Sequence, residues 1–142
     1  MRRERKRKGF TLVELLVVVG IISLLATMLV PRFFKGLGQT KAKIARAKMV
    51  RIEDAVARFQ LDCGRLPTDA DGGLEALIVA PADLESKWNG PYCKKSELLD
   101  PWDNPYQYLP EGQQNVGSFD LISYGADGQE GGEGDNQDIV ND

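Results

Sequence analysis

The side chains that could do chemistry in this chain are carboxylates, and they gather towards the C-terminus. Eleven Asp or Glu and no Lys or Arg follow Lys95, and residues 125–139 mix acidic residues with glycines. Ca²⁺ takes about six to eight oxygen ligands from carboxylates and backbone carbonyls, and a glycine-rich loop can present both. The same composition is also typical of a disordered tail or a solvated loop. The carboxylate spacing excludes an EF-hand.

Neither catalysis nor nucleic-acid binding is indicated. The chain has no His, no nucleophile elbow and no P-loop, and its carboxylates outside the acidic stretch are not paired beyond turns. Two Cys without a His cannot form an ordinary zinc site. The acidic C-terminal half lacks the basic patch that a nucleic acid requires. The sequence therefore predicts a protein that is not an enzyme and has no nucleic-acid partner.

The apolar N-terminal stretch, residues 10–30, contains a single charged residue, Glu14. As a helix this stretch is about 30 Å long, which matches the hydrocarbon core of a bilayer. Six of the eight residues before Gly9 are basic, so the N-terminus is predicted to stay in the cytoplasm while the C-terminal part is exported. No small-residue cleavage site follows the stretch, which predicts that the helix stays with the mature protein.

The position of Glu14 has two interpretations. A carboxylate in a lipid-exposed helix costs about 1 to 3 kcal/mol unless it has a partner, and ionisable residues in spans are usually functional. Because Glu14 lies near the start of the span, it could simply extend to the headgroups. Alternatively, it meets a cationic partner within the membrane.

Residues 8–15, Lys-Gly-Phe-Thr-Leu-Val-Glu-Leu, resemble the class III signal of type IV pilins and pseudopilins. The resemblance implies that a prepilin peptidase cuts between Gly9 and Phe10, and that the new N-terminal residue, Phe10, is methylated. The Glu14 carboxylate would then pair with the α-amino group of Phe10 in a neighbouring subunit. Such pairing offsets the desolvation of both charges at one axial register only.

The helical pattern continues beyond the span with an interruption at residues 31–38. Pro31 removes a backbone donor, and Gly36 and Gly38 each weaken a helix by about 1 kcal/mol relative to Ala. We therefore expect a kinked or soft helix here, although Pro31 could also mark only the end of the span. The resemblance implies local unwinding near this proline in a filament.

Residues 39–61 form an amphipathic pattern. Apolar residues step by three and four along one face, which predicts a helix that docks on a sheet of the same chain, although heptad spacing is also typical of a coiled coil. The predicted seam consists of Ala42, Ala45, Met49, Ile52, Val56, Phe59 and Cys63.

Turns and short elements make up the rest of the chain. Gly64 and Pro67 predict the end of the helix, and a short helix is expected over residues 73–79. Residues 106–109 and 118–124 favour strands that form a hairpin. The carboxylates between these elements are expected to serve turns and caps.

Cys63 and Cys93 are the only cysteines, and both lie in the exported part. In an oxidising periplasm a disulfide between them would close a loop of about 30 residues and add about 3 to 4 kcal/mol. Because Cys63 also lies on the apolar seam, it could equally be a packed free thiol. The sequence leaves both alternatives open.

Four further sequence motifs indicate one group within the type IV pilin-like family. These motifs are Leu-Asp-Cys-Gly-Arg-Leu-Pro-Thr at residues 61–68, Gly-Leu-Glu-Ala-Leu at 73–77, Asp-Pro-Trp-Asp-Asn-Pro-Tyr at 100–106 and Ser-Tyr-Gly-Ala-Asp-Gly at 123–128. Together with the N-terminal signal, they resemble the major pseudopilins of the type II secretion system. Asp103 stands where many relatives have Gly. If that turn needs a positive φ, Asp can adopt it.

The resemblance implies an α+β, pilin-like fold, in which a long N-terminal helix spans the membrane with its first half and packs on a small antiparallel sheet with its second. The expected organisation is a cleaved leader at 1–9, an assembly helix at 10–38 and a periplasmic domain at 39–142, the last divided into a helix at 39–62, loops with a short helix at 64–99, and the sheet with a C-terminal loop at 100–142.

Major pseudopilins hold one structural Ca²⁺ in the C-terminal loop, so the resemblance implies a calcium site here. Asp127 matches the family's Ala/Pro-Asp-Gly carboxylate, and Asp138 fits the second acidic position, for which Asp135 is the competitor. Leu121 and Ser123 would contribute backbone or hydroxyl oxygens.

The function implied by the resemblance is that of a structural subunit of the periplasmic pseudopilus, which polymerises through its N-terminal helix and helps move folded proteins across the outer membrane. The expected partners are other copies of the chain, minor pseudopilins, an inner-membrane assembly platform and a prepilin peptidase. The expected location is the bacterial inner membrane, with the C-terminal domain in the periplasm. Two alternatives are a type IV pilin for adhesion, motility or DNA uptake, and a membrane-tethered Ca²⁺-binding module that does not polymerise.

Overall fold

The computed structural model describes residues 9–142, without the side chains of residues 33–35 and 37. The basic leader at residues 1–8, on which the predicted orientation depends, lies outside the described residues. Contacts between residues divide the chain into two compact units, one that ends at Leu37 and one that comprises Gly38–Asp142.

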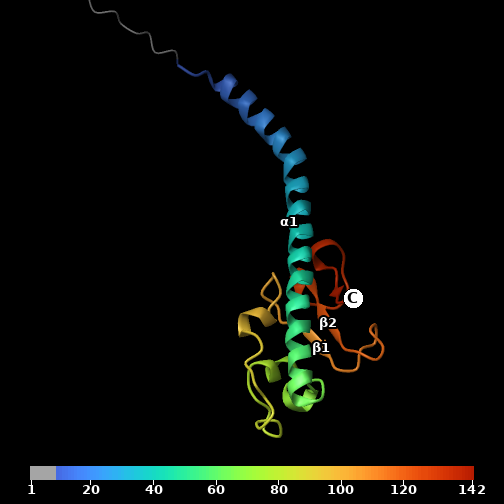
Figure 1. Cartoon of the computed structure of the whole chain (residues 1–142). Helices are drawn as coiled ribbons and strands as arrows, with labels where there is room; N and C mark the ends of the chain where they lie inside the picture. Colours follow the sequence, from blue (N-terminus) through green and yellow to red (C-terminus); the bar gives the residue numbers. More distant parts are fainter. Residues whose placement is uncertain (1–8) are drawn as a thin grey trace, which may run out of the picture. The chain divides into compact units, whose positions relative to one another are not determined.

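Helix α1 runs from Leu12 to Cys63 and contains Pro31 (Figure 1). The segment at residues 31–38, expected to be kinked or soft, is part of this continuous helix. The stretch Leu12–Arg32 has a mean hydropathy of 2.6 and none of it is buried within the chain. It is the one candidate membrane span found among the described residues.

The second half of α1 supplies one side of the hydrophobic core. Six of the seven predicted seam residues are buried, and Ala42 packs against them half-buried. Ile52, Val56 and Phe59 are completely inaccessible to solvent. The residues that cover this seam come from the sheet and the connecting loops, and include Leu74, Leu77, Leu98, Tyr106, Phe119, Leu121 and Ile139. The helix thus docks on its own chain, as the sequence predicts.

The sheet has three short antiparallel strands in the order β1-β2-β3. Strand β1 (Gln107–Leu109) pairs with β2 (Asp120–Ser123), and β2 pairs with β3 (Ile139–Val140). The predicted hairpin is confirmed, although both strands are shorter than expected. Strand β3 was not predicted, because two residues carry no recognisable alternation.

Between α1 and the sheet the chain forms 3-10 turns: η1 at Asp69–Asp71, η2 at Gly73–Leu77 and η3 at Lys95–Leu98. The short helix expected over residues 73–79 is thus a 3-10 helix that ends earlier. Gly73 itself has a φ of 62°, which a regular α-helix does not accommodate.

Hydrogen bonds and ion pairs of Asp71 and Arg65 stabilise the first of these turns, η1. The Asp71 carboxylate accepts hydrogen bonds from the Thr68 backbone amide at 2.8 Å and from its hydroxyl at 2.7 Å. Arg65 donates to Asp71 through both terminal nitrogens and to Asp83 at 3.0 Å. The Arg65 guanidinium holds the pKa of Asp71 well below its usual range. This carboxylate therefore serves a cap, as the sequence predicts.

Replacement of Phe59 by Ala tests the role of the helix seam. Phe59 is completely buried, so Phe59→Ala should destabilise the chain by about 3 to 5 kcal/mol through lost burial and a residual cavity. Leu61→Ala is the matched control, because Leu61 lies one half-turn away and is 84% exposed. Chemical denaturation of the full chain in detergent micelles measures both, and equal losses for the two variants would contradict the docking of this seam.

Candidate functional site

The first part of the candidate site is the start of α1. Gly9 and Phe10 precede the helix, and Phe10 is 82% exposed, so the peptide bond between them is accessible within the described part of the chain. Thr11 accepts a hydrogen bond from the Glu14 amide on its hydroxyl at 3.2 Å, which caps the helix. Glu14 then lies in the first turn, where a carboxylate interacts favourably with the helix dipole.

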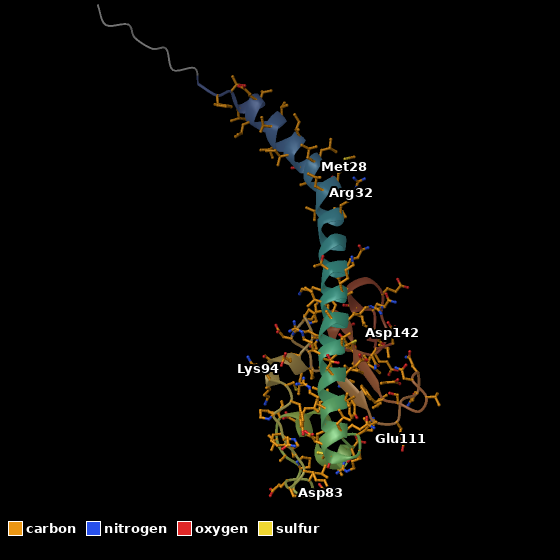
Figure 2. All side chains as sticks on the ribbon, in the orientation of Figure 1. Met28, Arg32, Asp83, Lys94, Glu111 and Asp142 are labelled. Carbon is orange, nitrogen blue, oxygen red and sulfur yellow. The ribbon has the colours of Figure 1, made fainter. Side chains whose placement is uncertain are left out.

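No ion pair among the described residues involves Glu14, whose side chain is exposed. The apolar side chains of the same stretch also stand out from the ribbon around Met28 and Arg32 (Figure 2). This segment therefore presents an uncovered apolar surface with one carboxylate near its end. Either lipid or other helices must cover such a surface.

The second part is the acidic loop between β2 and β3, which is folded rather than a free tail. It contains two 3-10 turns, η4 (Gly125–Asp127) and η5 (Gly134–Asn136). Gly125 has a φ of 67°, and a β-carbon at this position would lie 2.6 Å from the Asp135 carbonyl oxygen. The glycines thus allow two segments of the loop to approach each other closely.

Asp138 and Asp135, the two candidates for the second acidic ligand, have different surroundings. One carboxylate oxygen of Asp138, Oδ2, accepts a hydrogen bond from the Gly131 amide at 2.8 Å. The other, Oδ1, is buried and has no hydrogen-bond partner among the described residues. The Asp135 carboxylate instead packs on α1, where its Oδ1 occupies the place that a β-carbon on Gly38 would need. Asp138 therefore fits a cation ligand better than Asp135, because its free oxygen needs a partner.

The other predicted ligands lie around this loop but already have partners. Asp127 accepts a hydrogen bond from the Gln129 amide at 3.1 Å and remains exposed. The Ser123 hydroxyl donates to the buried Asp100 carboxylate at 2.6 Å. The Leu121 carbonyl accepts from the Asn141 amide at 3.1 Å. A cation at this site would thus use backbone oxygens together with Asp127 and Asp138.

No group of three or more His, Cys, Asp or Glu side chains that could hold a metal occurs within the part of the chain that the structure describes. The predicted carboxylates are consequently not assembled into a side-chain cage.

Two buried carboxylates near the loop were not identified from the sequence. Asp100 accepts hydrogen bonds from the Trp102 and Asn104 amides, both at 2.9 Å. Asp120 is 1% exposed and accepts from three consecutive backbone amides, those of residues 113–115. Burial opposes ionisation of Asp120, but these amides lower its pKa. Both residues organise turns, and the Asp-Pro pair at Asp100 was the only sequence signal.

The two cysteines are free thiols in the structure, so the alternative of a disulfide is not realised there. Cys63 is buried on the helix seam, and burial raises the pKa of its thiol. Burial also raises the pKa of Cys93 to about 11. Neither thiol has the lowered pKa of a reactive cysteine.

The family model of type II secretion system protein G matches residues 32–142, and that of the prokaryotic N-terminal methylation motif matches residues 5–30. The chain belongs to the type II secretion system protein G family. The two matched regions include all of α1 except Pro31, and the whole of Gly38–Asp142.

Members of the protein G family are similar over nearly the whole chain. The type II secretion system core protein G of Vibrio cholerae is 41% identical over 143 residues, which cover 99% of this chain and 95% of that protein. That of Pseudomonas aeruginosa is 40% identical over 141 residues, 98% of this chain and 97% of that protein. The crystal structure of the major pseudopilin of enterohaemorrhagic Escherichia coli is 29% identical, with a TM-score of 0.57 over 72% of this chain and 87% of that one.

As a member of the protein G family, the chain is a structural subunit of the pseudopilus of the type II secretion system and not an enzyme. The predicted α+β, pilin-like fold is confirmed by the long helix, the small antiparallel sheet and the likeness to the major pseudopilin. The protein G match also separates the chain from the type IV pilins that were the first alternative.

Two glycines of the acidic loop provide a matched test of its folding. Gly125 and Gly134 have φ values of 67° and 63°, so Ala at either costs about 1 to 2 kcal/mol in backbone strain. At Gly125 the added β-carbon would also meet a carbonyl oxygen, whereas none of the described atoms lies within 4 Å of that position at Gly134. Thermal unfolding should therefore show a clearly larger loss for Gly125→Ala, and similar losses would argue against this loop conformation.

Proposed function

We propose that the subunit is a single-pass protein of the bacterial inner membrane, with its N-terminus in the cytoplasm and Gly38–Asp142 in the periplasm. The apolar stretch Leu12–Arg32, no part of which is buried within the chain, is the observation that carries this proposal. The basic residues before Gly9 support the orientation, because positively charged flanks remain on the cytoplasmic side.

The same proposal includes processing and assembly at the start of α1. A prepilin peptidase cuts between Gly9 and Phe10, the amino group of Phe10 is methylated, and the Glu14 carboxylate pairs with that amino group in the next copy. The methylation motif over residues 5–30 and the exposed Gly9–Phe10 peptide bond support this sequence of events. The direct partners are other copies of the chain, the peptidase, an inner-membrane assembly platform and minor pseudopilins.

A structural Ca²⁺ in the acidic loop completes the proposal. Asp127 and Asp138 would hold the ion together with backbone oxygens of the loop, and the ion would supply a positive charge that links segments of the chain. The buried Oδ1 of Asp138 supports this assignment, because it has no partner among the described residues. A buried carboxylate oxygen left without a partner costs about 1 to 3 kcal/mol or more, which a cation would recover.

Replacement of Glu14 by Ala tests assembly. Glu14→Ala removes the carboxylate that sets the axial register, so sheared fibres from cells that overexpress the subunit should fall at least tenfold, while membrane insertion remains. Ser23→Ala is the control, because it removes a polar group from the same stretch whose hydroxyl only bonds the Val19 carbonyl at 2.8 Å. Fibres in normal amounts from the Glu14→Ala variant would refute the pairing.

Removal of the metal tests the loop. At a Ca²⁺ concentration about 100 times its Kd, binding stabilises the folded chain by about 2.7 kcal/mol, which raises the Tm of a domain of this size by roughly 10 °C. Calorimetry of the full chain in detergent should show this rise with CaCl₂ and its loss with EDTA.

Three variants assign the ligands in the same experiment. Asp138→Ala should abolish the rise in Tm, Asp135→Ala should keep most of it, and Asp142→Asn should keep all of it, because the Asp142 side chain is fully exposed. A Tm that EDTA leaves unchanged in the unmodified chain would remove the metal from the proposal.

A further inference from the structure

Asn141, three residues after the proposed ligand Asp138, connects four parts of the folded unit. Its side-chain oxygen accepts hydrogen bonds from the Leu121 amide of β2 at 2.7 Å and from the Asn115 side chain at 3.2 Å. Its side-chain nitrogen donates to the Glu53 carboxylate of α1 at 2.8 Å. Its backbone amide donates to the Leu121 carbonyl at 3.1 Å. One amide side chain thus links the C-terminus, the sheet, the turn at residues 112–118 and the helix.

The hydrogen bond to Glu53 is the short polar contact between the C-terminal segment and α1, and it adds to the apolar burial of Ile139 in the core. The Arg46–Asp142 ion pair is 3.9 Å long and its side chains are 59% and 103% exposed, so it contributes little. A small open surface pocket of about 80 Å³ lies between this segment and α1, and its lining includes Met49, Glu53, Val140 and Asn141. The segment is therefore held by strand pairing, by the buried Ile139 side chain and by the polar contacts of Asn141.

The rest of the segment is short. Strand β3 consists only of Ile139 and Val140, and Ile139 is its one buried side chain. The residue before it, Asp138, buries an oxygen that lacks a partner among the described residues. This unpaired oxygen opposes docking of the segment, and a bound cation would reverse that opposition.

We propose that residues 138–141 form a latch in which Asn141 is the positioning residue: cation binding at Asp138 closes the latch, and the closed latch holds the Glu53 carboxylate of α1 and the turn at residues 112–118 in place. This inference rests on the proposed Ca²⁺ site and goes beyond it, because it assigns the connection between that site and the helix to one residue. Ordering of the helix surface at Glu53 thereby becomes dependent on the cation.

The test uses the full chain in detergent micelles, with two measurements. Calcium titration calorimetry gives the affinity, and hydrogen exchange followed by mass spectrometry gives the protection of residues 112–121. Asn141→Ala removes the connection without a change in charge. It should weaken Ca²⁺ binding by about tenfold or more, since an open latch lowers the fraction of molecules that can bind the ion. It should also speed hydrogen exchange of residues 112–121, even with Ca²⁺ present.

Gln137→Ala is the matched control, because it shortens an exposed amide side chain in the same segment that makes no hydrogen bond of the latch. It should leave the affinity and the exchange unchanged. If Asn141→Ala gives the affinity and exchange of the unmodified chain, or if Gln137→Ala matches its defects, the positioning role of Asn141 is wrong.

A charge exchange keeps the inference testable if Asn141→Ala fails to fold. Asn141→Asp retains the acceptor for the Leu121 amide but places a carboxylate against Glu53, so residues 112–121 should exchange faster. Adding Glu53→Gln restores the original net charge and lets the introduced glutamine amide donate to the introduced aspartate carboxylate, the reverse of the original hydrogen bond. The double variant should therefore recover the protection of residues 112–121 from exchange. Lack of recovery would overturn the latch.

The exchange data also distinguish this inference from the calcium proposal. If the unmodified chain binds no Ca²⁺, the cation proposal fails and cation-dependent closure fails with it. The exchange of the Asn141 and Glu53 variants then still decides whether Asn141 holds the helix and the turn together.

Discussion

Burial of one face of α1 is the constraint on which the folded unit depends. The elements that surround this face are too small to be stable alone: the longest strand has four residues, and the remaining helices are 3-10 turns of three to five residues. Isolated strands and turns of this size do not form independently in water. The seam of Ile52, Val56 and Phe59 gives them a common surface, and burial of such side chains contributes about 1.5 to 3 kcal/mol each.

Because regular structure is sparse, buried carboxylates replace it as the means of satisfying backbone amides. Asp71, Asp100 and Asp120 each accept hydrogen bonds from backbone amides of a turn. A carboxylate oxygen accepts such bonds more strongly than a carbonyl, since the bond is charge-assisted. Part of the acidic bias of the chain is thus structural. Asp138 differs from these three, since one of its oxygens is buried without a partner in the described chain.

The sequence predicted the features that repeat or depend on local backbone chemistry. The three-and-four spacing identified the buried seam of α1, and alternation identified the hairpin of β1 and β2. Asp103 does adopt a φ of 65°, the only positive value of a non-glycine residue in the described chain. By contrast, the hydrogen bonds of Asn141 join residues far apart in sequence. Those of Asp120 are local, to the amides of residues 113–115, but they lie in an irregular turn without a recognisable pattern. Pro31 lies within the continuous α1, because a helix can lose one hydrogen bond where its neighbours continue.

The exposed half of α1 places a chemical condition on the proposed assembly. None of Leu12–Arg32 is buried within the chain, so its surface must be covered by lipid before assembly and by other copies afterwards. In lipid, Glu14 can reach the headgroups from the first turn of the helix, whereas between helices it needs a cation. Before cleavage the nitrogen of Phe10 is a neutral amide, and only hydrolysis of the Gly9–Phe10 bond converts it into an ammonium group. The uncut chain would therefore bury an unpaired carboxylate on assembly, at a cost of several kcal/mol, so in this mechanism processing must come before polymerisation.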